Sequence, residues 1–297
     1  RDSLFLHKCT KQMKKQKNIS VYGSTGFIGS RFCQLYQDDV VKIPREQTNP
    51  ETSEVLYFIS TTNNYNIFED PHVDIETNLN FLIDVLERCK DKEGLVFNFI
   101  SSWFVYGKTD DLPAREDSVC NPRGFYSITK RAAEQLLVSY CETFKIKYRI
   151  FRLGNVFGET DSGVSKKKNA LQYLINEVCN NRDINLYDDG SNIRDYIYVD
   201  DVCRAIRMCI DVAAYNEVVN IGSGMPRTIK EIVSYCKEKL DSKSNSLVHI
   251  EAPEFHKIVQ VKNMYLDITK LKNLGYNPEF NIWDKIDVII ENLRSQQ

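Results

Sequence analysis

Short apolar runs typical of buried β-strands alternate along this chain with segments that have helical spacing. In residues 77–89, for example, Leu79, Leu82, Ile83 and Leu86 would share one helix face, and residues 30–37 and 130–144 are also expected to be helical. Strands that alternate with helices predict βαβ units and a parallel sheet. We therefore expect an α/β fold. The expected strands are Ile19–Tyr22, Val40–Ile43, Val55–Ile59, Leu95–Ile100 and Tyr148–Arg152.

Three glycines stand between the first expected strand and the helix that follows it, in Gly23-Ser24-Thr25-Gly26-Phe27-Ile28-Gly29. Gly23 permits a tight turn, Gly26 lets the backbone approach a pyrophosphate, and Gly29 lets helix and strand pack closely. The helix N-terminus would offer free N–H groups to the phosphates. An ordinary strand-to-helix turn rarely needs three glycines at this spacing, so we predict a Rossmann-type dinucleotide site. Its candidate cofactor-binding residues are Gly23, Thr25, Gly26, Phe27, Ile28, Gly29 and Ser60.

The end of the second strand bears on which dinucleotide binds. A carboxylate there favours NAD, through the ribose hydroxyls, whereas an arginine favours the 2′-phosphate of NADP. Here the strand ends in Ile43-Pro44-Arg45, and the first acid is Glu46. Arg45 could also be a solvated loop charge. We favour NADP slightly over NAD, with Arg45 as a cofactor contact.

Tyr126 and Lys130 are four residues apart, which places them on one helical face. An ammonium group near a phenol favours the phenolate, so we expect Lys130 to lower the pKa of Tyr126. Such a tyrosine could exchange a proton with a substrate hydroxyl near neutral pH. Ser101 and Ser102 end a buried strand, at the edge where open α/β sheets bind ligands, and a serine there could hydrogen-bond the same oxygen.

With these motifs in order, the chain resembles the extended short-chain dehydrogenase/reductases, a family of nucleotide-sugar epimerases, dehydratases and reductases. The resemblance implies that Ser102, Tyr126 and Lys130 are catalytic, that Tyr126 and Lys130 also contact NAD(P), and that Asn78 supports the proton network. It further implies that Asn155 and Arg194 hold the diphosphate of a nucleotide-activated sugar. The other segments that carry it are Asp70-Pro71, Glu76-Thr77-Asn78, Val105-Tyr106-Gly107, residues 152–155, residues 194–201, Asn220-Ile221-Gly222-Ser223-Gly224 and residues 274–278.

Two departures from the family pattern narrow the expected activity. Trp103 and Phe104 follow Ser102, where dehydratases and decarboxylases of the family carry an acid and where 3,5-epimerase/reductases need a cysteine. The remaining activities are 4-epimerisation, which we favour, and NADPH-dependent reduction of a 4-keto sugar nucleotide; a non-catalytic NAD(P)-binding module is a third possibility. Trp103 would either contact the substrate or simply pack beside it.

The second departure is a deletion, because only residues 47–54 separate Glu46 from the strand at Val55. The family normally has a helix and another strand there, so we expect a doubly wound sheet shortened near its third strand. Weaker, exchangeable cofactor binding would follow, which suits a reductase. A phosphate-binding arginine is also missing near His256-Lys257, where Lys257 could replace it or be plain surface.

Charge and cysteine content set the remaining expectations. The chain of 297 residues has a net charge of −2, with +5 on residues 1–18 and −7 on the rest, which argues against nucleic-acid binding. No apolar run is long enough for a membrane span, and nine scattered cysteines without metal-ligand spacing suggest a reducing cytoplasm and no metal. Dimers are common in the resembled family, so a homodimer is one expectation. We divide the chain into a basic extension (1–18), a Rossmann domain (19–155 and 196–223) and a smaller mixed α/β lobe for the nucleotide sugar (156–195 and 224–290).

Overall fold

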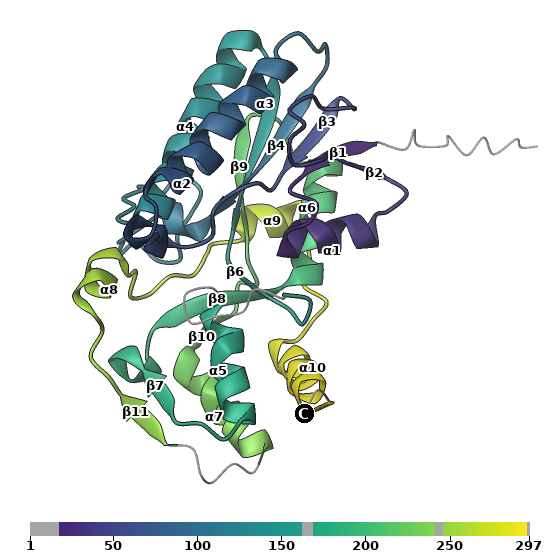
Figure 1. Ribbon diagram of the computed structural model, residues 1–297. Helices are drawn as coiled ribbons and strands as arrows, with labels where there is room; N and C mark the ends of the chain where they lie inside the picture. The colour runs from purple at the N-terminus through teal and green to yellow at the C-terminus, as the bar shows by residue number, and fades with distance from the viewer. Residues whose placement is uncertain (1–17, 162–168, 241–245, 296–297) are drawn as a thin grey trace, which may run out of the picture.

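A six-stranded parallel sheet forms the centre of the computed structural model, which describes residues 18–161, 169–240 and 246–295 (Figure 1). The predicted basic extension lies outside these residues, except for Asn18. The strand order is β2-β1-β3-β4-β5-β9, so the chain reverses direction across the sheet between β1 and β3, where open sheets of this kind bind ligands. The strands are β1 (Ile19–Tyr22), β2 (Val40–Lys42), β3 (Glu54–Tyr57), β4 (Val96–Ser102), β5 (Lys147–Leu153) and β9 (Glu217–Ile221).

Helices cover both faces of this sheet, because successive strand residues point to opposite sides (Figure 1). In β1, Ile19 and Val21 belong to the core beneath α1 and α6, whereas Tyr22 belongs to the core beneath α3 and α4. The Rossmann-type fold is thereby confirmed. The helices of this half are α1 (Phe27–Leu35), η1 (Asn64–Phe68), α2 (His72–Ile75), the π-helix η2 (Glu76–Asn80), α3 (Phe81–Cys89), η3 (Trp103–Val105), α4 (Phe125–Phe144) and α6 (Val199–Val212).

The predicted shortening of the sheet is confirmed between β2 and β3. A loop lies where the family normally has a helix and another strand, so β2 is the edge strand of the sheet. The loop is tied to β1: Thr52 Oγ1 accepts a 2.9 Å hydrogen bond from the Ser20 amide, and the Tyr22 hydroxyl donates to the Thr48 carbonyl at 2.7 Å. The segment therefore stays close to β1 instead of extending the sheet beyond β2.

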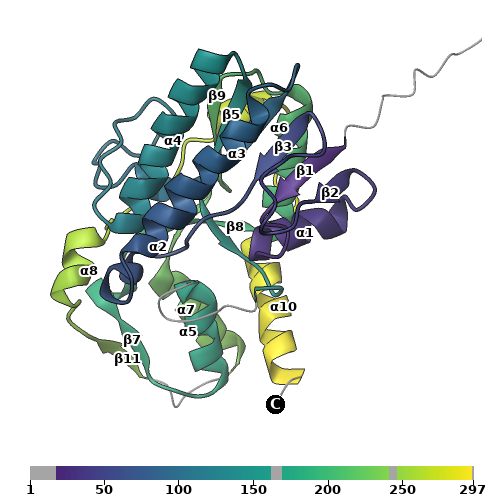
Figure 2. The ribbon, with the colours of Figure 1, turned by 45° about the horizontal axis from the view of Figure 1, so that its top comes forward.

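A smaller lobe of mixed helix and strand lies below the large sheet in Figures 1 and 2. Strand β8, whose second half we placed with the nucleotide-binding sheet, pairs instead with β6 and β10. The predicted division of the chain into domains stays a prediction. The elements of this half are β6 (Asn155–Phe157), α5 (Ala170–Cys179), β7 (Ile184–Leu186), η4 (Tyr187–Gly190), β8 (Ile193–Tyr198), β10 (Pro226–Thr228), α7 (Ile229–Lys239), β11 (Leu247–His249), α8 (Glu254–Val259) and α10 (Ile282–Ser295). The late helix α9 (Thr269–Asn273) instead packs against β9 of the large sheet.

Within the described residues, no helix is both long enough and apolar enough to cross a membrane. The eight cysteines in this part of the chain are all free, and six of them are buried.

Candidate active site

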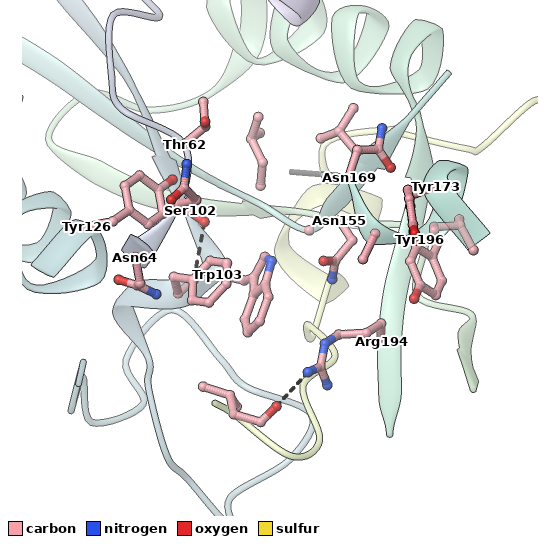
Figure 3. Close-up of a pocket in the computed structure, with 18 of the residues that line it drawn as sticks. Thr62, Asn64, Ser102, Trp103, Tyr126, Asn155, Asn169, Tyr173, Arg194 and Tyr196 are labelled. Carbon is pink, nitrogen blue, oxygen red and sulfur yellow. Dashed lines mark hydrogen bonds between the residues drawn. The ribbon is translucent and has the colours of Figure 1, made fainter. Parts of the chain in front are cut away.

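A cavity of about 750 Å³ lies between the carboxyl ends of the large sheet and the smaller lobe. The glycine turn, Ser102 and Tyr126 line it from the sheet side, and Asn155 and Arg194 line it from β6 and β8 (Figure 3). Residues from distant parts of the chain therefore meet here, as the resemblance implies.

The glycine turn is as tight as its sequence predicts. Gly23 has φ of +78°, and its carbonyl accepts a 3.1 Å hydrogen bond from the Gly26 amide. A Cβ on Gly29 would lie 2.2 Å from the Gly23 carbonyl oxygen, so only glycine fits there. No side chain caps α1 at Gly26, which leaves its first amides to a ligand. This cradle at a helix N-terminus fits the pyrophosphate of NAD(P).

The other predicted cofactor contacts differ in whether they line the cavity. Phe27, Ile28 and Ser60 line the cavity, whereas Thr25 and Arg45 are exposed and do not. Arg45 lies in the turn after β2, at the open edge of the sheet. Its predicted contact with a 2′-phosphate stays a prediction.

Tyr126 lies in the first turn of α4 and faces Ser102 at the end of β4 (Figure 3). Burial raises the pKa of Tyr126, although hydrogen bonds with the Ser102 and Ser60 hydroxyls act in the opposite direction. The predicted lowering of this pKa by Lys130 is therefore wrong for the structure described here. The phenol is held as a proton donor.

Lys130 is directed into the sheet and does not hydrogen-bond to the phenol. Its Nζ donates to the Ile100 carbonyl at 2.7 Å and lies 4.2 Å from the centroid of the Phe99 ring. Burial lowers the pKa of Lys130 to about 7, with Glu134 acting in the other direction. The group is therefore only partly charged at neutral pH while the phenol is protonated.

Asn78 lies in the π-helix η2, a rare form that is frequent at functional sites. Its Oδ1 accepts hydrogen bonds from Ser60 Oγ at 3.0 Å and from the Thr61 amide at 2.9 Å. Its Nδ2 donates to Thr61 Oγ1 at 2.8 Å and to Thr129 Oγ1 at 2.9 Å. Asn78 therefore fixes Ser60, which in turn contacts Tyr126, and this is a more indirect link to the proton network than we predicted.

Aromatic rings form the wall beside Ser102. The Trp103 and Phe104 rings are stacked with centroids 3.9 Å apart, and Phe104 meets the edge of Tyr126 at 5.7 Å. Trp103 is buried and also lines the cavity, so it both packs and is available to a ligand.

The opposite wall carries Arg194 and Asn155. Burial lowers the pKa of Arg194, and its guanidinium donates to the Ile193, Lys262 and Val261 carbonyls at 2.6–2.8 Å. Asn155 differs, because its buried Nδ2 has no hydrogen-bond partner among the described residues. A buried amide without a partner, on a cavity wall, fits a ligand that supplies the acceptor.

Several polar lining residues were missed by sequence reasoning. The run from Ser60 to Asn64 directly follows β3, so the argument applied to Ser102 at the end of β4 would have found it. Tyr173 of α5 had no such signal, whereas Tyr196 of β8 lies in the segment 194–201 that carries the family resemblance. The missed lining residues include Thr61, Thr62, Asn63, Asn64, Asn169, Tyr173 and Tyr196.

The question about Lys257 is answered by its position. Lys257 pairs with Glu251 at 2.7 Å and Glu254 at 2.8 Å on the surface and does not line the cavity, whereas the adjacent His256 does. Other residues of the recognised motifs hold the fold together. Asp195, for example, accepts hydrogen bonds from the Ser223 amide and hydroxyl.

Residues 55–222 match the model of the NAD dependent epimerase/dehydratase family, a span that includes Ser102, Tyr126, Lys130, Asn155 and Arg194. The chain is 25% identical over 270 residues to the Escherichia coli dTDP-4-dehydro-6-deoxyglucose reductase, covering 89% of this chain and 82% of that protein. It is 26% identical over 255 residues to the UDP-glucuronate 4-epimerase of Thermodesulfobacterium geofontis, covering 84% and 76%.

The fold matches that of the Thermotoga maritima UDP-glucose 4-epimerase, whose crystal structure contains UDP-glucose. The TM-score is 0.83 at 23% identity, covering 94% of this chain and 99% of that one. Because the family match spans more than half of the chain, this protein is an enzyme of the NAD-dependent epimerase/dehydratase family.

Proposed function

We propose that this enzyme acts by hydride transfer at C4 of a nucleotide-activated sugar, as a 4-epimerase. The observation that carries the proposal is the arrangement of the cavity, in which Ser102 and Tyr126 face the ligand space from one wall and Asn155 and Arg194 from the other. A sugar ring between these walls would meet two hydroxyl groups, while its diphosphate would meet an amide and a guanidinium. A planar guanidinium and an amide without a partner suit phosphate oxygens.

NAD(P) would be held by the glycine turn, Phe27, Ile28 and Ser60, with Tyr126 and Lys130 beside the reacting atoms. When bound, it accepts or donates a hydride. The chain's own residues would move the proton: once substrate and cofactor are bound, an ionised Tyr126 would take it from the C4 hydroxyl as the carbonyl forms, and the phenol would return it when the carbinol re-forms. Ser102 hydrogen-bonds the same oxygen and keeps it near the phenol.

Trp103 and Phe104 restrict the chemistry to C4. Neither side chain can transfer a proton, and their stacked rings occupy the wall next to Ser102. Elimination of water or loss of carbon dioxide from the sugar needs an acid or base at a further carbon, so we expect neither reaction.

The test is conversion of UDP-glucose to its C4 epimer by the purified protein with NAD, followed by nuclear magnetic resonance of the sugar. Tyr126→Phe removes the proton-transfer group and should reduce the rate by about 10²–10⁴. Tyr140→Phe is the matched control, since Tyr140 lies on the same helix and contacts Glu87 at the surface. Equal rates for wild type and Tyr126→Phe would refute the assignment.

A second candidate function, reduction of a 4-keto sugar nucleotide by NADPH, is favoured by the open sheet edge at β2. The missing strand and the exposed Arg45 beside this edge suit a cofactor that binds through its 2′-phosphate and exchanges after each turnover. Mass spectrometry of small molecules released from the purified protein separates the two functions. Tightly held NAD supports epimerisation, whereas an empty site that binds NADPH supports reduction.

Arg45 can be tested separately. Arg45→Ala should weaken NADPH binding by about tenfold and leave NADH binding unchanged, as expected for loss of one contact to a 2′-phosphate. An equal loss for both dinucleotides would assign Arg45 another role.

A further inference from the structure

Asp74 of α2 is a fully buried carboxylate beneath the active site. Its Oδ1 accepts a short hydrogen bond from Thr61 Oγ1 and a second one, at 3.1 Å, from Asn66 Nδ2. Its Oδ2 is buried without a hydrogen-bond partner among the described residues. Leaving a buried carboxylate oxygen unpaired is costly, so its presence calls for a physical explanation.

A continuous set of hydrogen bonds leads from this carboxylate to Tyr126. Thr61 Oγ1, which donates to Asp74, accepts from Asn78 Nδ2 at 2.8 Å. Asn78 Nδ2 also donates to Thr129 Oγ1 at 2.9 Å, and the Thr129 hydroxyl donates to the Tyr126 carbonyl at 3.0 Å. Asn78 Oδ1 accepts from Ser60 Oγ at 3.0 Å, and Ser60 lines the same cavity as the phenol. Because an amide cannot readily pass a proton along, this set orients groups but does not conduct protons.

The charge of Asp74 also acts on Tyr126 directly. In the water-excluded space between α2 and α4 its field is weakly screened, and it adds to burial in raising the pKa of Tyr126. Burial and the charge of Asp74 therefore both favour the protonated phenol.

Other charges do not replace this effect. Lys130, one turn along α4, is partly neutral at pH 7 because burial lowers its pKa. Neither η1 nor η3 contains a charged residue, and β4 contains none. The other charged groups on the helices and strands packed against α4 are exposed or paired: His72, Glu76, Asp84, Glu87, Arg88, Lys147, Arg149 and Arg152.

We propose that Asp74 is a positioning residue for proton transfer at Tyr126. Through Thr61, Asn78 and Ser60 it fixes the hydroxyl that contacts the phenol, and its negative charge keeps the phenol protonated until substrate and cofactor are bound. The inference rests on the proposed role of Tyr126 in proton transfer. The simpler alternative is that Asp74 only anchors Thr61 and Asn66.

Asp74→Asn separates the two roles, since the amide keeps an acceptor oxygen for Thr61 and Asn66 but removes the charge. The protein is labelled with fluorotyrosine, and the Tyr126 resonance is identified by its absence in Tyr126→Phe. Its ionisation is then followed by fluorine NMR in wild type and Asp74→Asn. The midpoint should move to lower pH in Asp74→Asn, because the charge that opposes ionisation is gone.

Asp84→Asn is the matched control, because it removes an exposed carboxylate from α3 in the same helical layer. It should leave the Tyr126 midpoint where it is in wild type. A midpoint that is unchanged in Asp74→Asn, or that moves equally in Asp84→Asn, would overturn the proposal.

Asp74→Ser provides a second neutral residue at the same position, with the same expected shift. If neither neutral variant folded, Asp74 would be a structural anchor and the proposal would be wrong. The readout does not depend on turnover. A midpoint shift in a wild-type protein that does not epimerise would reject the proposed 4-epimerase function, while the effect of the Asp74 charge on Tyr126 would still be established.

Discussion

The guanidinium of Arg194 lies over the indole ring of Trp103, 5.3 Å from the ring centroid. Trp103 follows β4 of the large sheet, whereas Arg194 belongs to β8 of the smaller lobe, so this pair joins the two walls of the cavity. The indole thus contacts a group expected to bind the diphosphate and also stacks on the Phe104 ring. Trp103 therefore packs and lines the substrate space at once.

Replacing Trp103 tests this link. Trp103→Leu should raise the KM for the nucleotide sugar about fivefold with a smaller change in kcat, because a cation–π contact is worth about 1 kcal/mol and the loss concerns binding. Steady-state kinetics measure both constants. Trp283→Leu is the control, since Trp283 packs on Tyr235 away from the cavity. A loss confined to kcat would contradict the proposed role of Trp103.

Alanine substitutions at two glycines of the turn should have different effects, one on stability and the other on cofactor affinity. Gly29→Ala should destabilise the protein by about 3 kcal/mol, because its Cβ would meet the Gly23 carbonyl oxygen at 2.2 Å. In Gly26→Ala the nearest contact is an ordinary 3.4 Å, so stability should change by less than about 1 kcal/mol while NAD(P) affinity falls. Urea unfolding and cofactor titration distinguish the two variants. Equal stability losses would show that close packing is not the constraint at Gly29.

Burial of Lys130 predicts a pH-dependent stability. Its folded pKa of about 7 lies below the ordinary value of 10.5, so the unfolded chain binds more protons between these values and stability rises with pH. From pH 7 to pH 9 this group should contribute about 2 kcal/mol. The rise should be smaller by that amount in Lys130→Met, as measured by urea unfolding without added nucleotide. Parallel stability curves for the two proteins would mean that Lys130 keeps its charge in the fold.

A buried ion pair joins α4, the helix that carries Tyr126, to β5. Glu134 Oε1 accepts from Arg152 Nε at 3.0 Å, and Glu134 Oε2 accepts from Arg152 Nη2 at 2.8 Å. Burial raises the pKa of Glu134, but the Arg152 hydrogen bonds outweigh it and the pKa falls below its usual range. Glu134→Gln would leave the Arg152 guanidinium buried without its anion, which should cost about 3–5 kcal/mol of unfolding free energy. Glu142→Gln, at an exposed position of the same helix, should cost little. Similar costs for both variants would show that the pair adds no net stability.

Much of the candidate site could be predicted from the sequence, because its residues lie where strands end and helices begin. The turn after β1 and the serine that ends β4 were predicted from position and residue type alone. The helix boundaries were less accurate: α1 begins at Phe27 and α4 at Phe125, earlier than the apolar periodicity indicated. In both helices the first turn lines the cavity and does not continue the apolar spacing of the later turns.

The protonation state of the site could not be predicted in this way. The spacing of Tyr126 and Lys130 predicts one helical face, but it does not show that Lys130 is directed to the Ile100 carbonyl. Nor does it show that burial raises the pKa of one group and lowers that of the other. Desolvation depends on every element packed around the helix. The charge that adds to it at Tyr126 belongs to Asp74, which no motif singled out.

The sequence by itself determined the parallel α/β sheet, the glycine cradle for a dinucleotide and the shortened edge at β2, because strand alternation, glycine spacing and segment length are local properties of the chain. Only the tertiary structure decided which polar groups meet across the cavity. It placed the Asn155 amide, which has no partner among the described residues, on one wall, set Trp103 against Arg194, and connected Asp74 to Asn78 through Thr61. These relationships join residues of different elements, and they exist only once the sheet and the smaller lobe have packed around one cavity.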